Sequence, residues 1–259
     1  MSVPTATQVA ALLDERLASS GFPDYPPALN GLQLDHQGPV RKVVAAVDFS
    51  RRTIDAAIAA GGNLLLLHHG MFWGGNQRLV GHHYERLRDL LSHDIAVYAS
   101  HLPLDAHLEL GNCAQLARRL GLTVSGRFGQ YQGVPIGVMG EADVSLMDLL
   151  SRAQAFAVTL GGGARASHEV AGQHCHRWAV ITGAGADATT LREAHACGID
   201  TLIVGEGPHH TTVDAAELGV TVIYAGHYAT ETLGVQALLE VVGREFGLPT
   251  EFLYLPTGS

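Results

Sequence analysis

Lysine is nearly absent from this sequence of 259 residues, because only Lys42 among its sixteen Lys and Arg residues is a lysine. No G-x-x-x-x-G-K-[ST] motif surrounds it, so a P-loop is excluded, and Schiff-base chemistry has a single candidate. The sequence also lacks the G-x-S-x-G motif of a serine nucleophile. Fifteen histidines, in contrast, leave imidazole-based chemistry open.

Cysteine, long apolar runs and positive charge are also scarce. The three cysteines have no C-x-x-C spacing and are odd in number, so a disulfide framework is not expected. No window approaches the eighteen apolar residues of a membrane span, and the N-terminus does not resemble a secretory signal. The net charge of −9 disfavours binding to nucleic acid. We therefore expect a cytoplasmic protein that binds neither membranes nor nucleic acid.

Two segments, residues 43–69 and 178–206, share a pattern of strand, turn, helix and strand. An offset of 137 positions places Ile54 on Leu191 and Gly61 on Gly198. The short, unbroken apolar runs are typical of strands buried on both faces, and the helix between them suits a right-handed βαβ crossover. The sequence therefore predicts parallel sheets in an α/β fold.

The repeat returns downstream, where residues 96–101 match residues 222–227 at an offset of 126. The first half therefore carries 11 extra residues, in the loop that begins at Gly70. We predict two similar α/β domains, 1–126 and 127–259, although residues 127–176 have no clear pattern. The alternative is a single doubly wound sheet that reuses βαβ units.

The conspicuous polar residues follow the predicted strands, at the edge where open α/β sheets bind ligands. They are His68, His69, His101, Glu206 and His227. An acid lies four residues beyond two of these histidines, at Asp105 and Glu231, and on a helix both side chains of each pair would share one face.

Neighbouring side chains on a strand point to opposite faces, so we do not expect His68 and His69 to ligate one ion. Two ions that share a carboxylate solve this problem, at a separation of about 3.5–4 Å. A His and carboxylate set suits Zn, Mn, Fe, Ni or Co. The alternative for the His68-His69 pair alone is a capped or surface pair.

Four runs of sequence are similar to signatures of the NIF-three-like dinuclear metal centre proteins, also called GTP cyclohydrolase I type 2 homologs. They are Asn30-Gly31-Leu32-Gln33, residues 68–73 (HHGMFW), residues 101–105 (HLPLD) and residues 226–231 (GHYATE). The resemblance implies two α/β domains facing a shared, metal-containing cleft, and a homohexamer built as a trimer of dimers. It implies two divalent ions per subunit, held by His68, His69, Asp105, His227 and Glu231.

Other residues near the predicted centre have open roles. His101 is not a usual ligand of the family, so we expect it to orient Asp105 or substrate, or with Glu206 to move a proton. Phe72 and Trp73 could stack on a base, cover the cleft or pack a domain interface. Residues 183–188 fit a dinucleotide-binding G-x-G-x-x-[GA] motif formally, but we favour a tight turn at a helix N-terminus.

Two classes of function fit these features. The first is a metal-dependent hydrolase, GTP cyclohydrolase-like or phosphohydrolase-like, acting on a nucleotide or another phosphate-containing small molecule. The second is a metal-delivery protein or a metal-dependent scaffold without turnover. Carboxylate-bridged sites that are poor in cysteine favour the first.

Overall fold

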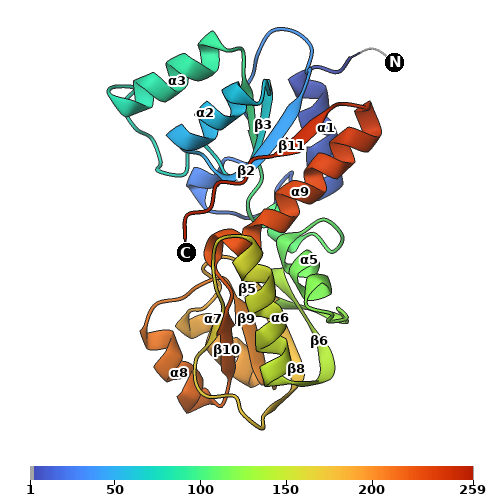
Figure 1. The fold of residues 1–259 in the computed structure, drawn as a ribbon, viewed down its shortest axis with the longest axis vertical. Coiled ribbons are helices and arrows are strands. Elements are labelled where there is room, and N and C mark those ends of the chain that lie inside the picture. The colour runs from blue at the N-terminus through green and yellow to red at the C-terminus, as the bar shows by residue number, and fades with distance from the viewer. Residues whose placement is uncertain (1–2, 259) are drawn as a thin grey trace. The chain divides into compact units, whose positions relative to one another are not determined.

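The computed structural model describes residues 3–258 as an α/β fold with two compact units (Figure 1). Unit 1 contains the chain up to Leu104 and the segment Gly234–Leu255, and unit 2 contains Asp105–Leu233 and the last residues from Pro256. Each unit has its own sheet, as its own strand order shows. No helix in the described part of the chain is long and apolar enough to cross a membrane.

The sheet of unit 1 has the order β1-β4-β3-β2-β11. Strands β2, β3, β4 and β11 are parallel, and β1 runs antiparallel to β4. Every residue of β3 is buried, as expected for a parallel strand that is covered on both faces. The strands are β1 (Gly31–Leu34), β2 (Val43–Asp48), β3 (Leu64–His69), β4 (Ala96–Ala99) and β11 (Thr250–Phe252).

Helices cover both faces of this sheet. One face packs against α2 (Arg51–Ala59) and α3 (His82–Ser92), which lie side by side (Figure 1). Helix α1 (Ala6–Leu17) reaches the sheet through Asp14, whose Oδ1 accepts a hydrogen bond of 2.9 Å from the Tyr98 hydroxyl. A short 3₁₀ helix, η1 (Pro26–Ala28), leads into β1. Helix α1 begins at a capping box, in which the side chains of Thr5 and Gln8 bind each other's backbone N–H groups.

The sheet of unit 2 has the order β5-β6-β8-β9-β10-β7. Strands β8, β9 and β10 are parallel, and the other pairings are antiparallel. One apolar cluster joins the sheet to α5 and α6, with Trp178 fully buried in it, and another joins it to α7 and α8. The strands are β5 (Gly126–Tyr131), β6 (Val134–Ser145), β7 (Arg165–Ala166), β8 (His174–Ile181), β9 (Thr201–Val204) and β10 (Thr221–Tyr224); the helices are α5 (Asn112–Arg119), α6 (Leu146–Thr159), α7 (Ala188–Ala196) and α8 (His210–Leu218).

The predicted parallel βαβ units are confirmed. In unit 1 the run β2-α2-β3-α3-β4 places Leu65 between Val44 and Val97, and in unit 2 the run β8-α7-β9-α8-β10 has the same topology. The segment 127–176 had no clear pattern because it holds additions to the repeat. These are most of the antiparallel pair β5 and β6, then α6 and the short edge strand β7.

The residue ranges of the two compact units differ from the predicted halves 1–126 and 127–259. The boundary falls first inside α4 (Leu102–Ala106), and then inside α9 (His227–Phe246), between Leu233 and Gly234. The segment Gly234–Leu255 belongs to unit 1, where its strand β11 pairs in parallel with β2. A repeat in sequence therefore does not fix where the chain divides into compact units.

Truncation of the central strand of unit 1 should be costly. Leu65 is fully buried in β3, so we expect Leu65→Ala to lower the free energy of unfolding by about 2–5 kcal/mol through lost burial and a residual cavity. Leu91 on α3 is 58% exposed, and Leu91→Ala should change it by less than about 0.5 kcal/mol. Urea unfolding followed by circular dichroism measures both. Equal costs would contradict the described packing.

Candidate metal centre

Three buried histidines lie together at the carboxyl ends of β3 and β4 in unit 1. His68 and His69 are the last residues of β3, and His101 follows β4 by two residues. The ring centroids are 4.8 Å apart for His68 and His69, and 4.9 Å for His68 and His101. One ring nitrogen from each histidine lies within 4.8 Å of the other two, so the group could hold a metal ion.

The rings of His68 and His69 lie closer together than alternation along the strand suggests. Alternation along the strand fixes the Cα–Cβ directions, but each imidazole is a long side chain with its own torsions. The two residues are also the last of β3, where the chain turns into the loop at Gly70. Their rings therefore lie side by side, at an interplanar angle of 56°.

Each of these histidines has its Nδ1 atom held by a fixed acceptor. The distances are 2.9 Å from His68 Nδ1 to the Ser100 carbonyl and 2.9 Å from His69 Nδ1 to Asp48 Oδ1. His101 Nδ1 lies 2.8 Å from Asp24 Oδ1. Because these oxygens accept, each Nδ1 of a neutral imidazole carries the proton and each Nε2 carries the lone pair. Metal-binding histidines are oriented in this way.

Sequence reasoning missed Asp24 and Asp48. Asp48 has a signal in the sequence, since it ends β2 and pairs in register with His69 on the neighbouring strand. Asp24 lies in an irregular segment and meets His101 across 77 positions of sequence, so no periodicity indicates it. Burial acts to raise the pKa of Asp24, but the hydrogen bond and charge of His101 and the Asn30 amide outweigh it and leave the pKa below its ordinary value.

The run Asn30-Gly31-Leu32-Gln33 organises the loops that carry the histidines. The Asn30 side chain accepts from the His101 backbone N–H at 2.7 Å and donates to Asp24 at 2.8 Å. The Gln33 side chain accepts from the Met71 backbone N–H at 2.8 Å. A Cβ at Gly70 would overlap this Gln33 amide and the Cβ of Ala99, so glycine after His69 permits this close approach. The run therefore holds both loops in place.

Unit 2 holds a second group of polar side chains. Asp105 is buried, and its Oδ1 accepts hydrogen bonds from Asn112 Nδ2 at 2.8 Å and Thr182 Oγ1 at 3.0 Å. His227 and Glu231 lie on the first turns of α9, with Nε2 and Oε2 3.1 Å apart. The predicted helix with both side chains on one face is thus confirmed for this pair.

The two carboxylates of unit 2 act on one buried thiol. Burial, together with the charge of Asp105 and, more weakly, that of Glu231, raises the pKa of Cys113 to about 12. Asp105 and Glu231 are therefore close enough to the same thiol to influence it. Anionic oxygens that gather in a buried place are suited to a cation.

Glu206 contacts His227 directly. Its Oε1 lies 2.8 Å from His227 Nδ1, so His227 has the same arrangement as the three histidines of unit 1. Burial acts to lower the pKa of His227, but Glu231 and Glu206 outweigh it and raise the pKa to about 9. In the metal-free protein His227 is therefore largely protonated at neutral pH, and a metal must displace this proton.

The glycine turn of residues 183–188 has a structural explanation. Gly183 has a φ of +61°, and a Cβ there would overlap the Glu231 carboxylate. Its backbone N–H donates to Thr230 Oγ1 at 3.0 Å. The turn therefore permits a close approach to Glu231, and this accounts for Gly183 without a dinucleotide.

Trp73, from the extra loop after His69, packs against the histidines of unit 1. Its ring centroid lies 4.7 Å from that of His69 and 4.5 Å from that of His101. Trp73 therefore forms a wall beside these imidazoles, and the roles considered for the aromatic pair stay predictions.

The His227 environment predicts a pH dependence. In the metal-free protein the imidazole should titrate near pH 9, and Glu206→Gln should lower this pKa because one stabilising charge is lost. A raised pKa means that its contribution to stability is complete below about pH 6.5 and is lost as pH rises through about 9. NMR titration measures the pKa, and Glu217→Gln, an exposed change on α8, should leave it unchanged.

Comparison with known proteins identifies the family. Residues 4–255 match the description Duf34/NIF3 (NGG1p interacting factor 3). A "GTP cyclohydrolase 1 type 2 homolog" of Deinococcus radiodurans is 44% identical over 95% of this chain and 91% of its own length, and one of Escherichia coli is 36% identical over 96% and 98%. The crystal structure of TTHA1606 from Thermus thermophilus has a TM-score of 0.84 at 36% identity and covers 99% of this chain and 100% of its own. The chain therefore belongs to the Duf34/NIF3 family.

Proposed function

We propose that the two groups of side chains form one dinuclear metal centre and that the protein is a metal-dependent hydrolase. The proposed ligands are His68, His69, Asp105, His227 and Glu231. The observation that carries this proposal is the arrangement of the three ligand histidines, each with Nδ1 on a fixed oxygen, so that Nε2 is the atom left for a metal ion, in His227 after loss of its proton. We propose a nucleotide or another phosphate-containing small molecule as the substrate, a choice supported by the name of the curated relatives.

The ligand set fits divalent transition metals. Imidazole nitrogen and carboxylate oxygen suit Zn, Mn, Fe, Ni or Co, and two such ions would supply Lewis acidity and a water of lowered pKa. Asp105 is suited to a fixed ligand position, because Asn112 and Thr182 hold one of its oxygens. Gly183 leaves the Glu231 carboxylate the space it occupies.

His101 and Glu206 are the proposed proton carriers. Asp24 holds Nδ1 of His101, so Nε2 is the atom at which His101 would accept and release a proton. The half-exposed carboxylate of Glu206 contacts His227 Nδ1, and we propose that it exchanges protons with solvent. Glu206 also keeps the His227 imidazole oriented.

Burial of the ligands favours an enzyme over a protein that delivers metal. Transfer to an acceptor requires ligands that exchange readily, but His68, Asp105 and Glu231 are buried. Their positions depend on hydrogen bonds to the backbone and to neighbouring side chains.

We also propose the homohexamer that the family resemblance implies. Light scattering after gel filtration would measure the mass of the assembly.

Metal content should depend on Glu231. We expect two divalent ions per chain by elemental analysis of the natively purified protein, and at most one after Glu231→Gln, which removes the anionic charge. Turnover in a panel of nucleotides and phosphate esters should fall by at least about a hundredfold, as expected for loss of a metal ligand. Glu240→Gln, an exposed change further along the same helix, is the matched control and should affect neither.

Three results would contradict the proposed function. The first is native protein without transition metal. The second is equal metal content after His68, His69 and Glu231 are all replaced. The third is full occupancy without turnover in the panel, together with transfer of metal to an acceptor protein, which would favour delivery.

A further inference from the structure

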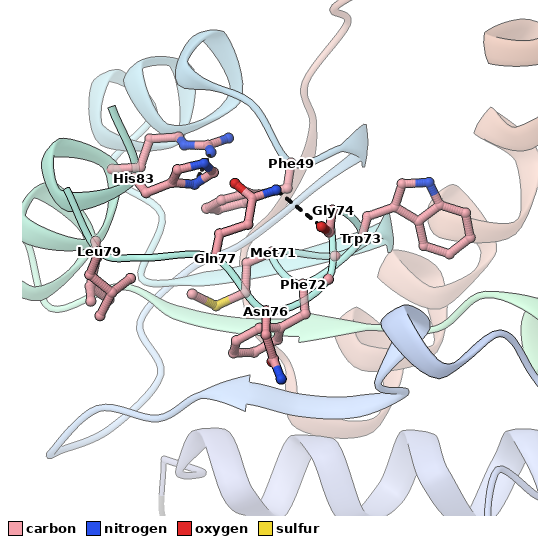
Figure 2. A pocket seen from close by; sticks show the side chains of 13 residues that line it. Phe49, Met71, Phe72, Trp73, Gly74, Asn76, Gln77, Leu79 and His83 are labelled. Carbon is pink, nitrogen blue, oxygen red and sulfur yellow. Dashed lines mark hydrogen bonds between the residues drawn. The ribbon is translucent and has the colours of Figure 1, made fainter. Parts of the chain in front are cut away.

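Unit 1 contains a cavity of about 540 Å³ between α3 and the loop after His69 (Figure 2). This volume is in the range of small-molecule sites. Apolar and aromatic side chains form much of its wall, among them Phe49, Met71, Phe72 and Leu79. The loop holds the 11 residues that the second half of the chain lacks, so the cavity belongs to the first half of the repeat only.

Arg86 brings a positive charge to this cavity. Its guanidinium carbon lies 5.1 Å from the centre of the Phe49 ring, and one Nη atom lies 2.7 Å from His83 Nδ1. Its Nε is buried and has no hydrogen-bond partner in the described part of the chain. No carboxylate of residues 3–258 pairs with it, whereas Arg51 and Arg88 nearby both pair with Asp89.

His83 does not supply the missing negative charge. Arginine can only donate, so the His83 Nδ1 that faces it must accept, and the imidazole is neutral with its proton on Nε2. Burial, with the charges of His82 and Arg86, lowers the pKa of His83 and keeps it neutral. Burial also lowers the pKa of Arg86, which remains charged at neutral pH. The cavity thus has one uncompensated cation and a donor, Nε, that is not used.

The cavity extends from Trp73 towards this cation. Trp73 and His83 both line it and lie at opposite ends in Figure 2, with Gln77 and Met71 between them. Trp73 is also the residue that packs against His69 and His101. A ligand that fills the cavity would therefore have one end beside Trp73 and the other beside Arg86.

We propose that this cavity recognises the substrate, and that the substrate is a small molecule with a planar ring and an anionic group that pairs with Arg86. A guanidinium binds phosphate and carboxylate through two parallel hydrogen bonds, and the aromatic wall suits a ring. Because Arg86 lies at the end away from the histidines, the anion is a recognition group and the hydrolysed bond lies elsewhere in the molecule. This inference rests on the proposed hydrolase function, and it favours a ring or amide bond over a terminal phosphate ester.

Binding to substituted proteins tests this cavity directly. The probes are guanosine monophosphate, guanosine, inorganic phosphate and indole-3-acetate, titrated by calorimetry into metal-free and metal-loaded protein. We expect guanosine monophosphate, indole-3-acetate or both to bind at least tenfold more tightly than guanosine, and their order distinguishes phosphate from carboxylate. The indole N–H resonance of Trp73 should shift on binding, but that of Trp178, buried in unit 2, should not.

Two variants and one control assign the site. Arg86→Gln should weaken anion binding at least tenfold, and Leu79→Trp should block the cavity without a change of charge. Arg78→Gln removes the same charge from an exposed position in the same loop that does not line the cavity, and should change affinity less than threefold. Circular dichroism confirms that each variant is folded.

The results separate this proposal from the proposed function. Equal losses in Arg86→Gln and Arg78→Gln, binding without a Trp73 shift, or no binding of any anionic probe would overturn the cavity as an anion site. Metal-dependent turnover with the same KM in wild type and Arg86→Gln would overturn it as the substrate site and leave the hydrolase standing. Binding that depends on Arg86 in a protein without metal or turnover would support the cavity and reject the hydrolase.

Discussion

The hydrogen bond at Nδ1 of each central histidine is the constraint on which the candidate centre depends. An imidazole with a free Nδ1 can rotate, exchange tautomers and present either nitrogen. In this protein four histidines, His68, His69, His101 and His227, have Nδ1 within 2.9 Å of an oxygen that can only accept. Each Nε2 therefore has its direction set before any ligand binds, which lowers the cost of binding a cation, although His227 must first lose its proton.

The four acceptors come from different parts of the fold, and this explains several unrelated features of the sequence. Ser100 offers a backbone carbonyl at the end of β4, and Asp48 ends the strand beside His69. Asp24 is itself held by Asn30, whose amide also binds the His101 backbone. The run Asn30-Gly31-Leu32-Gln33 is thus part of the site, although none of its side chains is a proposed ligand.

The sequence predicts the parts of the structure that depend on periodicity. The parallel βαβ units, the polar strand ends and the His227–Glu231 pair on one helix face all follow from repeat spacing and strand or helix geometry. Side-chain torsions do not follow from spacing, and for this reason the rings of His68 and His69 lie closer than alternation suggests. Contacts across long separations, such as Asp24 with His101, depend on irregular loops that have no period.

The two halves of the repeat have diverged in a way that divides the chemistry between them. The offset of 126 pairs His101 and Asp105 with His227 and Glu231, so both halves provide a histidine followed by an acid. The offset of 137 places Glu206 on His69, so the second half has a carboxylate where the first has an imidazole. The first half alone has the longer loop, and with it the aromatic cavity and the uncompensated charge of Arg86.

A cation that remains partly desolvated without an anion costs stability, since its charge is poorly hydrated and unpaired. Such a cost is consistent with a site for a ligand that supplies the missing charge, and it explains why a duplicated fold would keep one long loop and one short one.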